Sequence, residues 1–224
     1  MAVSSRGGVQ KEDKLYIFME LGKGSLHAEL AKYGSFKESM IRKYTWQILQ
    51  GLAYLHSQQT VHRDIKCANL LVDSSGQVKL ADFGMAKQMT EEVLVHSMKG
   101  SPYWMAPEVM GAVGRGGAGH VRDHGSWFSA DIWSLGCTIV EMADGKPPWS
   151  TCEGYSFLFR LDSGEVPAIP DHLSPEARDF LHLCFQHNPS ARPSAADLLS
   201  HQFLSPLHSA VYVIIPTLSN FPPY

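Results

Sequence analysis

The sequence lacks the features that mark membrane-spanning, secreted and polycationic proteins. No apolar run approaches the roughly 18 residues that a membrane-crossing helix needs, and the first eight residues contain no apolar stretch typical of a secretory signal. Nineteen basic residues against 22 acidic ones give a net charge of −3. The charge therefore predicts neither nucleic-acid binding nor membrane insertion. Length and composition favour one ordinary globular domain with a sizeable core.

Cysteine is also scarce. The four cysteines lie far apart and form no C-x-x-C pair: Cys67, Cys137, Cys152 and Cys184. We predict reduced thiols in a cytoplasmic or nuclear protein, and a metal site or disulfide framework is the less favoured alternative. His120 and His124 lie four residues apart, but their glycine-rich surroundings offer no rigid helix face for zinc.

The N-terminal third of the chain predicts a strand followed by two helices. Residues 1–13 are expected to be a flexible lead-in, and the apolar run 15–19 predicts a buried strand. A first helix is expected over residues 25–33. Ser35 and Glu38 form a capping-box pattern that predicts the start of a long helix. Its core-facing stripe recurs at helical spacing: Ile41, Tyr44, Thr45, Ile48, Leu49, Leu52 and Leu55.

The remaining chain alternates loops, short strands and helices. Residues 70–72 and 78–80 flank a turn and predict a hairpin. The glycine-rich residues 111–126 predict an irregular surface loop, whereas the apolar residues 131–142 predict a helix that is buried on most sides. Two further helices are predicted to begin after cap-like residues, Ser174 and Ser194.

Polar residues in the loops around the hairpin fit the chemistry of phosphoryl transfer. Asp64 can orient a hydroxyl and accept its proton, and Lys66, two positions later, can stabilise a transferred phosphate. Asn69 and Asp82 offer oxygen ligands, which suit Mg²⁺ on a triphosphate. Alone, an aspartate or lysine would be a solvated surface charge; the linked order of these residues favours the chemical interpretation.

Three motifs in this order carry a resemblance to a known family. VHRDIKCAN (61–69), DFG (82–84) and APE (106–108) resemble the catalytic loop, the metal-binding loop and the end of the activation segment of protein kinases. A lysine at position 66, after the aspartate, resembles the pattern of serine/threonine kinases. The amino-acid sequence is similar to that of MAP kinase kinase kinases in four stretches: 14–21, 100–109, 131–142 and 146–150.

The resemblance covers residues 14–204 and implies an α+β, mainly α fold. That fold is the C-terminal lobe of a kinase, a helical bundle with a small β-hairpin and catalytic loops. Of the N-lobe, we expect only the last strand, because no G-x-G-x-x-G loop and no Val-Ala-x-Lys lysine lie ahead of residues 15–19. Strand 15–19 is then expected to be an exposed apolar edge. Residues 205–224 are expected to be an irregular tail.

For the nucleotide, the resemblance implies a place in the adenine pocket for four residues. Met19 falls at the gatekeeper position, and Glu20 and Leu21 fall on the hinge. Leu71 would form the floor beneath the base. Plain core packing is the alternative interpretation.

Regulatory roles follow from the same resemblance. Arg63 would pair with a phosphate on the activation segment, for which Thr90 and Ser97 are candidate sites. Any hydroxyl in an exposed loop would look similar, so these two assignments stay open. Ser101 is expected to hydrogen-bond the catalytic aspartate and lysine.

Structural roles are implied as well. His62 and Phe83 match the lower half of the regulatory hydrophobic spine. Glu108 would form an ion pair with Arg192, and Asp131 would hold the backbone of the catalytic loop.

Two functions are compatible with these observations. The first is a serine/threonine kinase of MAP kinase kinase kinase type, which uses ATP and Mg²⁺ to phosphorylate a protein substrate, a MAP kinase kinase. The 224 residues alone are then expected to be nearly inactive, because the glycine loop and lysine are needed over the phosphates. The second is a truncated interaction module that binds partners without transferring phosphate.

Overall fold

The computed structural model describes residues 5–11, 14–19, 22–82, 86–88, 101–114 and 124–205. In this part of the chain the α-helices are α1 (Leu26–Tyr33), α2 (Glu38–Ser57), α3 (Pro107–Gly114), α4 (His124–Asp144), α5 (Ser156–Asp162), α6 (Pro175–Cys184) and α7 (Ala195–Leu198). The strands are β1 (Ser5–Lys11), β2 (Lys14–Met19), β3 (Gly24–Ser25), β4 (Thr60–Val61), β5 (Leu70–Val72), β6 (Val78–Leu80) and β7 (Lys87–Gln88). Short 3₁₀ turns are η1 (Cys67–Asn69), η4 (Pro102–Trp104), η5 (Pro189–Ala191) and η6 (Gln202–Leu204). The mainly helical α+β class is therefore as expected.

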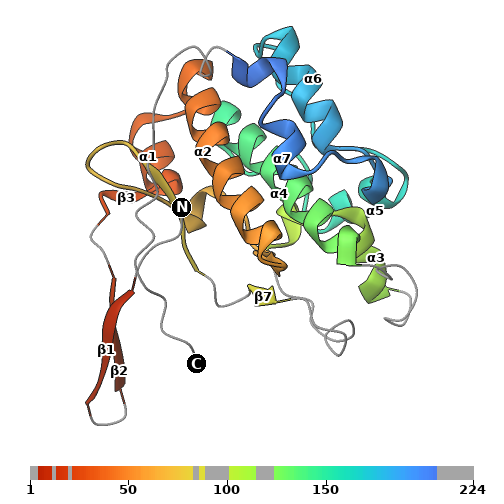
Figure 1. Cartoon of the computed structure of the whole chain (residues 1–224). Coiled ribbons are helices and arrows are strands. Elements are labelled where there is room, and N and C mark those ends of the chain that lie inside the picture. Colours follow the sequence, from red (N-terminus) through yellow and green to blue (C-terminus); the bar gives the residue numbers. More distant parts are fainter. Residues whose placement is uncertain are drawn as a thin grey trace.

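The helices pack into one body, and the hairpin of β1 and β2 projects away from it (Figure 1). β1 pairs antiparallel with β2, from Ser5 opposite Met19 to Lys11 opposite Lys14. The predicted flexible lead-in is therefore wrong for Ser5–Lys11. The strand at 15–19 has a pairing partner on one side. Ladder hydrogen bonds join backbone groups, so the Ser-Arg-Gly-Gly sequence of β1 forms a strand without the side-chain pattern that would predict one.

The long helix α2 has the predicted apolar face. All the residues of the expected stripe are buried, among them Ile41 and Leu52, which are completely inaccessible. α1 matches its prediction except at its first residue, because Ser25 is the N-cap and its side chain accepts a hydrogen bond from Ala28 N at 3.2 Å. Together these helices form one side of the core.

The predicted capping box at the start of α2 is wrong. The N-cap is Lys37, which makes no side-chain cap hydrogen bond. Glu38 instead accepts hydrogen bonds from the backbone N and the Oγ of Ser174, at 2.7 and 2.8 Å, and from Arg42 at 2.9 Å. A partner 136 positions along the chain, at the start of α6, has replaced the local one.

The predicted hairpin is present, and a third strand joins it. β5 pairs antiparallel with β6, and β3 pairs with the other edge of β5. The turn is closed by Asp73, whose Oδ1 accepts from Ser75 N at 2.8 Å and from Gln77 N at 3.1 Å. This small sheet supports the loop residues that precede and follow it.

Helix α4 runs through the centre of the body, and residues 131–143 are all buried, as predicted. The predicted irregular loop is wrong at both ends: residues 111–114 complete α3 and residues 124–126 begin α4. Extending an existing helix costs far less than nucleating one, so it can continue through glycine-rich sequence. Residues 115–123 lie outside the described part of the chain.

The last helices begin as predicted. Ser174 caps α6 by accepting from Ala177 N at 3.2 Å, and Pro175 occupies the first turn. Ser194 and Asp197 form a reciprocal capping box at α7. Of the expected tail, only Ser205 is described.

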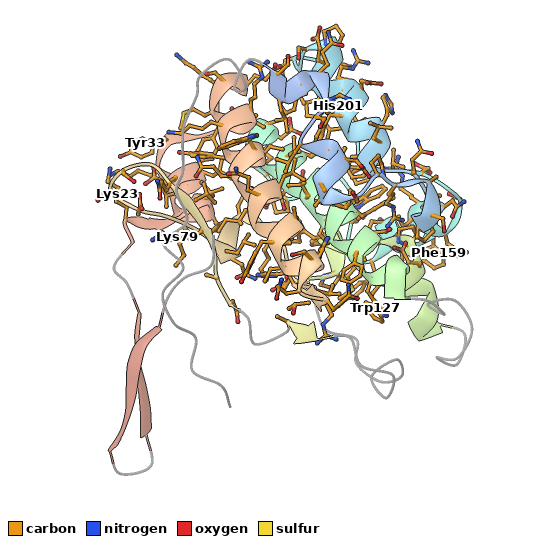
Figure 2. All side chains as sticks on the ribbon, in the orientation of Figure 1. Lys23, Tyr33, Lys79, Trp127, Phe159 and His201 are labelled. Carbon is orange, nitrogen blue, oxygen red and sulfur yellow. The ribbon has the colours of Figure 1, made fainter. Side chains whose placement is uncertain are left out.

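At the margin of the helical body, Phe159 on α5 is 81% exposed (Figure 2). No helix in the described ranges combines the length and apolarity needed to cross a bilayer.

Candidate active site

The centre of the site is the carboxylate of Asp64, which is buried in the loop between β4 and η1. Its Oδ1 accepts from the backbone N of Ser101 at 3.1 Å and from the Ser101 hydroxyl at 3.0 Å. Its Oδ2 lies 2.9 Å from Lys66 Nζ, and Lys66 also donates to the Ser101 hydroxyl. The expected contacts of Ser101 with the aspartate and the lysine are therefore present. Because each oxygen has donors, the carboxylate is fixed in position and its polar atoms are satisfied despite their burial.

Asn69 holds the same carboxylate from the other side. Its side-chain amide donates to Asp64 Oδ2 at 2.7 Å and to the Asp64 carbonyl at 2.9 Å, so the loop curls back on itself. With the amide nitrogen used in this way, the side-chain oxygen Oδ1 of Asn69 is the atom left for another ligand. Among the described residues no hydrogen bond to that oxygen is present.

Asp82 directly follows a residue whose backbone pairs with Asn69. The preceding residue, Ala81, donates its N–H to the Asn69 carbonyl at 2.9 Å, and Asp82 itself is exposed. Its φ of 61° is a left-handed conformation that is costly for a non-glycine residue and is typical of functional sites. One amide oxygen and one carboxylate are hard donors that suit Mg²⁺, which usually takes few protein ligands and completes its shell with phosphate and water. The residues therefore fit a magnesium–nucleotide complex.

The loop that carries Asp64 is anchored by Asp131 of α4. Asp131 accepts from His62 N at 2.9 Å and from Arg63 N at 2.8 Å, which is the expected hold on the catalytic-loop backbone. Arg63 has a φ of 69°, so these bonds stabilise a strained residue immediately before the central aspartate. Burial lowers the pKa of the Arg63 guanidinium, and the nearby Asp131 charge opposes that shift.

Asp131 has a further partner that the sequence did not indicate. His56, near the end of α2, places Nε2 at 2.9 Å from Asp131 Oδ2. Burial favours the neutral form of Asp131, but the hydrogen bond and charge of His56 outweigh it and hold the pKa of Asp131 below its usual value. The sequence stripe of α2 stopped at Leu55, so the polar residue that follows it was missed.

Three more residues of α4 were missed. Ser134 donates to the Trp104 carbonyl at 2.8 Å, and Glu141 accepts from Cys67 N at 3.1 Å. The Thr138 hydroxyl donates to the Ser134 carbonyl of its own helix at 2.7 Å and lies 3.4 Å from the Ile65 carbonyl. With Asp131 they are spaced three, four and three residues apart, which places them on one face of the helix. We call this row the polar face of α4: Asp131, Ser134, Thr138 and Glu141. Their spacing within an otherwise apolar helix was the signal that could have revealed them.

A buried ion pair joins Glu108 of α3 to Arg192, which precedes α7. Arg192 donates to both carboxylate oxygens of Glu108, at 2.6 and 2.8 Å, and its side chain is completely buried. It also donates to the carbonyls of Ser129 and Gln186 at 3.0 and 2.7 Å. The expected pair is therefore present, with the additional partners that a buried charge requires.

The other predicted residues are only partly described. His62 is completely buried, with Nε2 at 3.1 Å from the Ala81 carbonyl, and Leu71 is half-buried on β5. Met19 ends strand β2. The remaining predicted residues lie outside the described part of the chain: Glu20, Leu21, Phe83, Thr90 and Ser97.

Comparison with known proteins agrees with this geometry. A family model described as a protein kinase domain matches residues 3–204. The chain therefore belongs to the protein kinase family. The match begins before residue 14, so the expected loss of all N-lobe residues except one strand is not confirmed.

Within the family, the similar proteins are MAP kinase kinase kinases. The chain is 49% identical over 219 residues to mitogen-activated protein kinase kinase kinase 3 of Arabidopsis thaliana, covering 97% of this chain and 34% of that protein. It is 54% identical over 200 residues to mitogen-activated protein kinase kinase kinase YODA of the same plant, covering 88% and 22%. A third relative, mitogen-activated protein kinase kinase kinase A of Dictyostelium discoideum, is 46% identical over 209 residues, covering 92% and 21%. The chain thus spans about a fifth to a third of the length of these relatives.

Proposed function

We propose that this chain is part of a serine/threonine protein kinase of MAP kinase kinase kinase type. It supplies the residues that orient the hydroxyl group that accepts the phosphate. The observation that carries the proposal is the convergence of Lys66 and Ser101 on the buried carboxylate of Asp64. Asp64 orients the substrate hydroxyl and accepts its proton, and the Lys66 ammonium neutralises charge on the transferred phosphoryl group. Arrangements of this kind act by positioning and by electrostatic stabilisation more than by covalent chemistry.

The cofactors in this proposal are ATP and Mg²⁺. MgATP supplies the γ-phosphate and, through the metal, neutralises the phosphate charge. The Asn69 side-chain oxygen and the Asp82 carboxylate would hold the metal, which the hydrogen-bonded orientation of the Asn69 amide supports. Leu71 and residues 19–21 would contact the adenine.

The substrate in this proposal is a serine or threonine of another protein, a MAP kinase kinase. The names of the relatives support this class, because each is named a kinase of a MAP kinase kinase. Arg63 pairs with a phosphate on Thr90 or Ser97 when the activation segment is modified. A cytoplasmic or nuclear location stays a prediction.

The test of the proposal is phosphate transfer by the full-length protein to a MAP kinase kinase. We expect Asp64→Asn to lower the transfer rate by about 100-fold or more, because general-base catalysis typically contributes that much, while the fold is kept. Asp171→Asn, at an exposed position, is the matched control and should retain activity. Wild-type activity in the Asp64→Asn variant would refute the role of Asp64.

We also propose that residues 1–224 as an isolated polypeptide transfer little phosphate and act at most as a binding module. The sequence supports this, since no G-x-G-x-x-G loop and no Val-Ala-x-Lys lysine lie ahead of residues 15–19 to cover the phosphates. Direct comparison of ATP affinity and transfer rate between this polypeptide and the full-length protein provides the test. Equal rates would refute this second proposal and leave the first intact.

A further inference from the structure

The indole of Trp127 is a buried hydrogen-bond donor that the surrounding protein does not satisfy. Trp127 lies in the first turn of α4, at the margin of the helical body near α3 (Figure 2). Its Nε1 atom is buried, and no acceptor in the described part of the chain receives its hydrogen. A buried N–H without a partner is costly, and native proteins rarely contain one. The indole therefore indicates a partner that is not a protein atom.

The same indole lines a small cavity. The other walls include Arg63 of the catalytic loop, Met105 after η4, Val109 of α3 and Asp131 of α4. The space open to a water-sized sphere is about 20 Å³, and one water needs about 10–15 Å³ of such space. The cavity therefore has room for one water and is too small for a nucleotide or for a phosphate group with its five heavy atoms.

Two side chains in the cavity wall can accept further hydrogen bonds. Asp131 Oδ1 accepts one, from Arg63 N at 2.8 Å, although a carboxylate oxygen can accept two. Ser134, which also lines the cavity, donates its hydroxyl hydrogen to the Trp104 carbonyl at 2.8 Å, and its oxygen accepts no hydrogen bond from the described residues. The cavity thus offers one donor and two acceptors. Water both donates and accepts, so it can bond all three groups.

The charges around the cavity disfavour simple ions of similar size. A cation would meet the positive charge of Arg63 and the N–H of Trp127, whereas an anion would meet the Asp131 carboxylate. An uncharged ligand avoids both repulsions. Size, hydrogen bonding and charge therefore agree on water.

We propose that this cavity binds one structural water, which accepts a hydrogen bond from Trp127 Nε1 and donates to Asp131 Oδ1 and Ser134 Oγ. The water joins the first turn of α4 to the polar face of the same helix, where the catalytic loop and α3 meet it. This role of Trp127 goes beyond the proposed phosphate transfer and does not depend on it.

The first test is a crystal structure of the full-length protein at a resolution that shows ordered waters. We expect one water about 2.7–3.2 Å from Trp127 Nε1, the usual range for such a bond, and within hydrogen-bond distance of Asp131 Oδ1 and Ser134 Oγ. Trp127→Phe keeps an aromatic ring but removes the donor, so the water should be lost from the structure of this variant. A cavity without water, an ion in its place, a protein carbonyl bonded to Trp127 Nε1, or an unchanged water in Trp127→Phe would overturn the proposal.

A second test uses another tryptophan as a matched control in solution. Trp133 Nε1 is also buried without an acceptor among the described residues, but Trp133 does not line the cavity. In full-length protein with isotope-labelled tryptophan, each indole N–H signal is identified by its absence from Trp127→Phe or Trp133→Phe. We expect a nuclear Overhauser effect from a long-lived water to the Trp127 signal and none to the Trp133 signal. No effect at Trp127, or equal effects at both, would overturn the proposal.

Discussion

The two longest helices of the molecule are used in different ways. α2 spans 20 residues and buries a stripe on one side, and its exposed side includes residues such as Tyr54. α4 spans 21 residues and is buried on all sides from residue 131 to 143, although four of those residues form its polar face. The two helices lie against one another in the centre of the body (Figure 1).

The difference shows where positioning resides in this fold. Apolar burial is non-directional, so the α2 stripe stabilises the domain without fixing any particular atom. Buried polar groups are costly unless they are hydrogen-bonded, and hydrogen bonds are directional. The polar face of α4 therefore fixes individual backbone atoms of residues 62, 63, 67 and 104. In contrast, α2 contributes apolar side chains to the core and, near its end, the histidine that contacts Asp131.

The largest effect is expected from Asp131→Ala. The change leaves the N–H groups of His62 and Arg63 without their acceptor and removes the partner of His56. Removing one member of a buried pair costs about 3–5 kcal/mol, so we expect that loss in the free energy of unfolding by urea denaturation, together with near-complete loss of phosphate transfer. Asp144→Ala on the same helix serves as the exposed control. A loss below 1 kcal/mol would show that the loop does not depend on this anchor.

For α2, Leu52→Ala should separate stability from catalysis. Leu52 is completely buried in the stripe, and removing a buried leucine side chain costs about 2–5 kcal/mol. Well below the unfolding temperature, kcat should stay within about twofold of wild type, since no hydrogen bond of the site is lost. Tyr54→Ala, on the exposed side, should change stability by no more than about 0.5 kcal/mol. A large fall in kcat for Leu52→Ala would break the distinction between the two helices.

Close packing of α4 gives an intermediate effect in Gly136→Ala. A Cβ at this position would lie 2.8 Å from Cys184 Cβ and 2.8 Å from Phe185 Cε1. Overpacking of this kind costs about 1–3 kcal/mol, measurable by thermal or urea unfolding. Adding Cys184→Ala should not recover the loss fully, because its Cβ remains and Phe185 still blocks the site. A neutral or stabilising Gly136→Ala would contradict the observed approach of α4 and α6.

The smallest effect is a difference in pH dependence. The pKa of Asp131 is lower in the folded state than the roughly 3.9 of an unfolded aspartate. The unfolded state therefore binds more protons between the two pKa values, so this contribution to stability is present above about pH 4 and is lost as pH falls through the folded pKa. Relative to wild type, Asp131→Asn should show a slope shallower by up to about 1.4 kcal/mol per pH unit in that window. Leu52→Ala changes no titrating group and should keep the wild-type slope. Identical slopes for wild type and Asp131→Asn would contradict the lowered pKa.

Patterns within a few residues of one another made much of the molecule predictable. The stripe of α2, the caps at Ser174 and Ser194, and the β5–β6 hairpin each depend on neighbours along the chain. The expected contacts of Ser101, Asp131 and Glu108 are also present, because the motifs that carry them match a family with a known arrangement.

Patterns with distant partners were not predictable in the same way. Ser35 and Glu38 satisfy the local rule for a capping box, yet Ser174 occupies the Glu38 carboxylate. β1 forms through backbone pairing with β2. The polar side chains at 134, 138 and 141 could be recognised as a row, but their acceptors and donors lie in loops some 30 to 70 positions away.

By itself the sequence determined the periodic helices, the turns and the set of polar residues that transfer of a phosphoryl group requires, since these depend on covalent order and short-range geometry. Only the tertiary structure decided which buried polar groups meet. Asp64 receives Lys66 from its own loop but Ser101 from another, and Glu141 receives one donor from each. The physical reason is that a buried polar atom must find a partner wherever the packed chain provides one, and packing places residues together without regard to their separation in sequence.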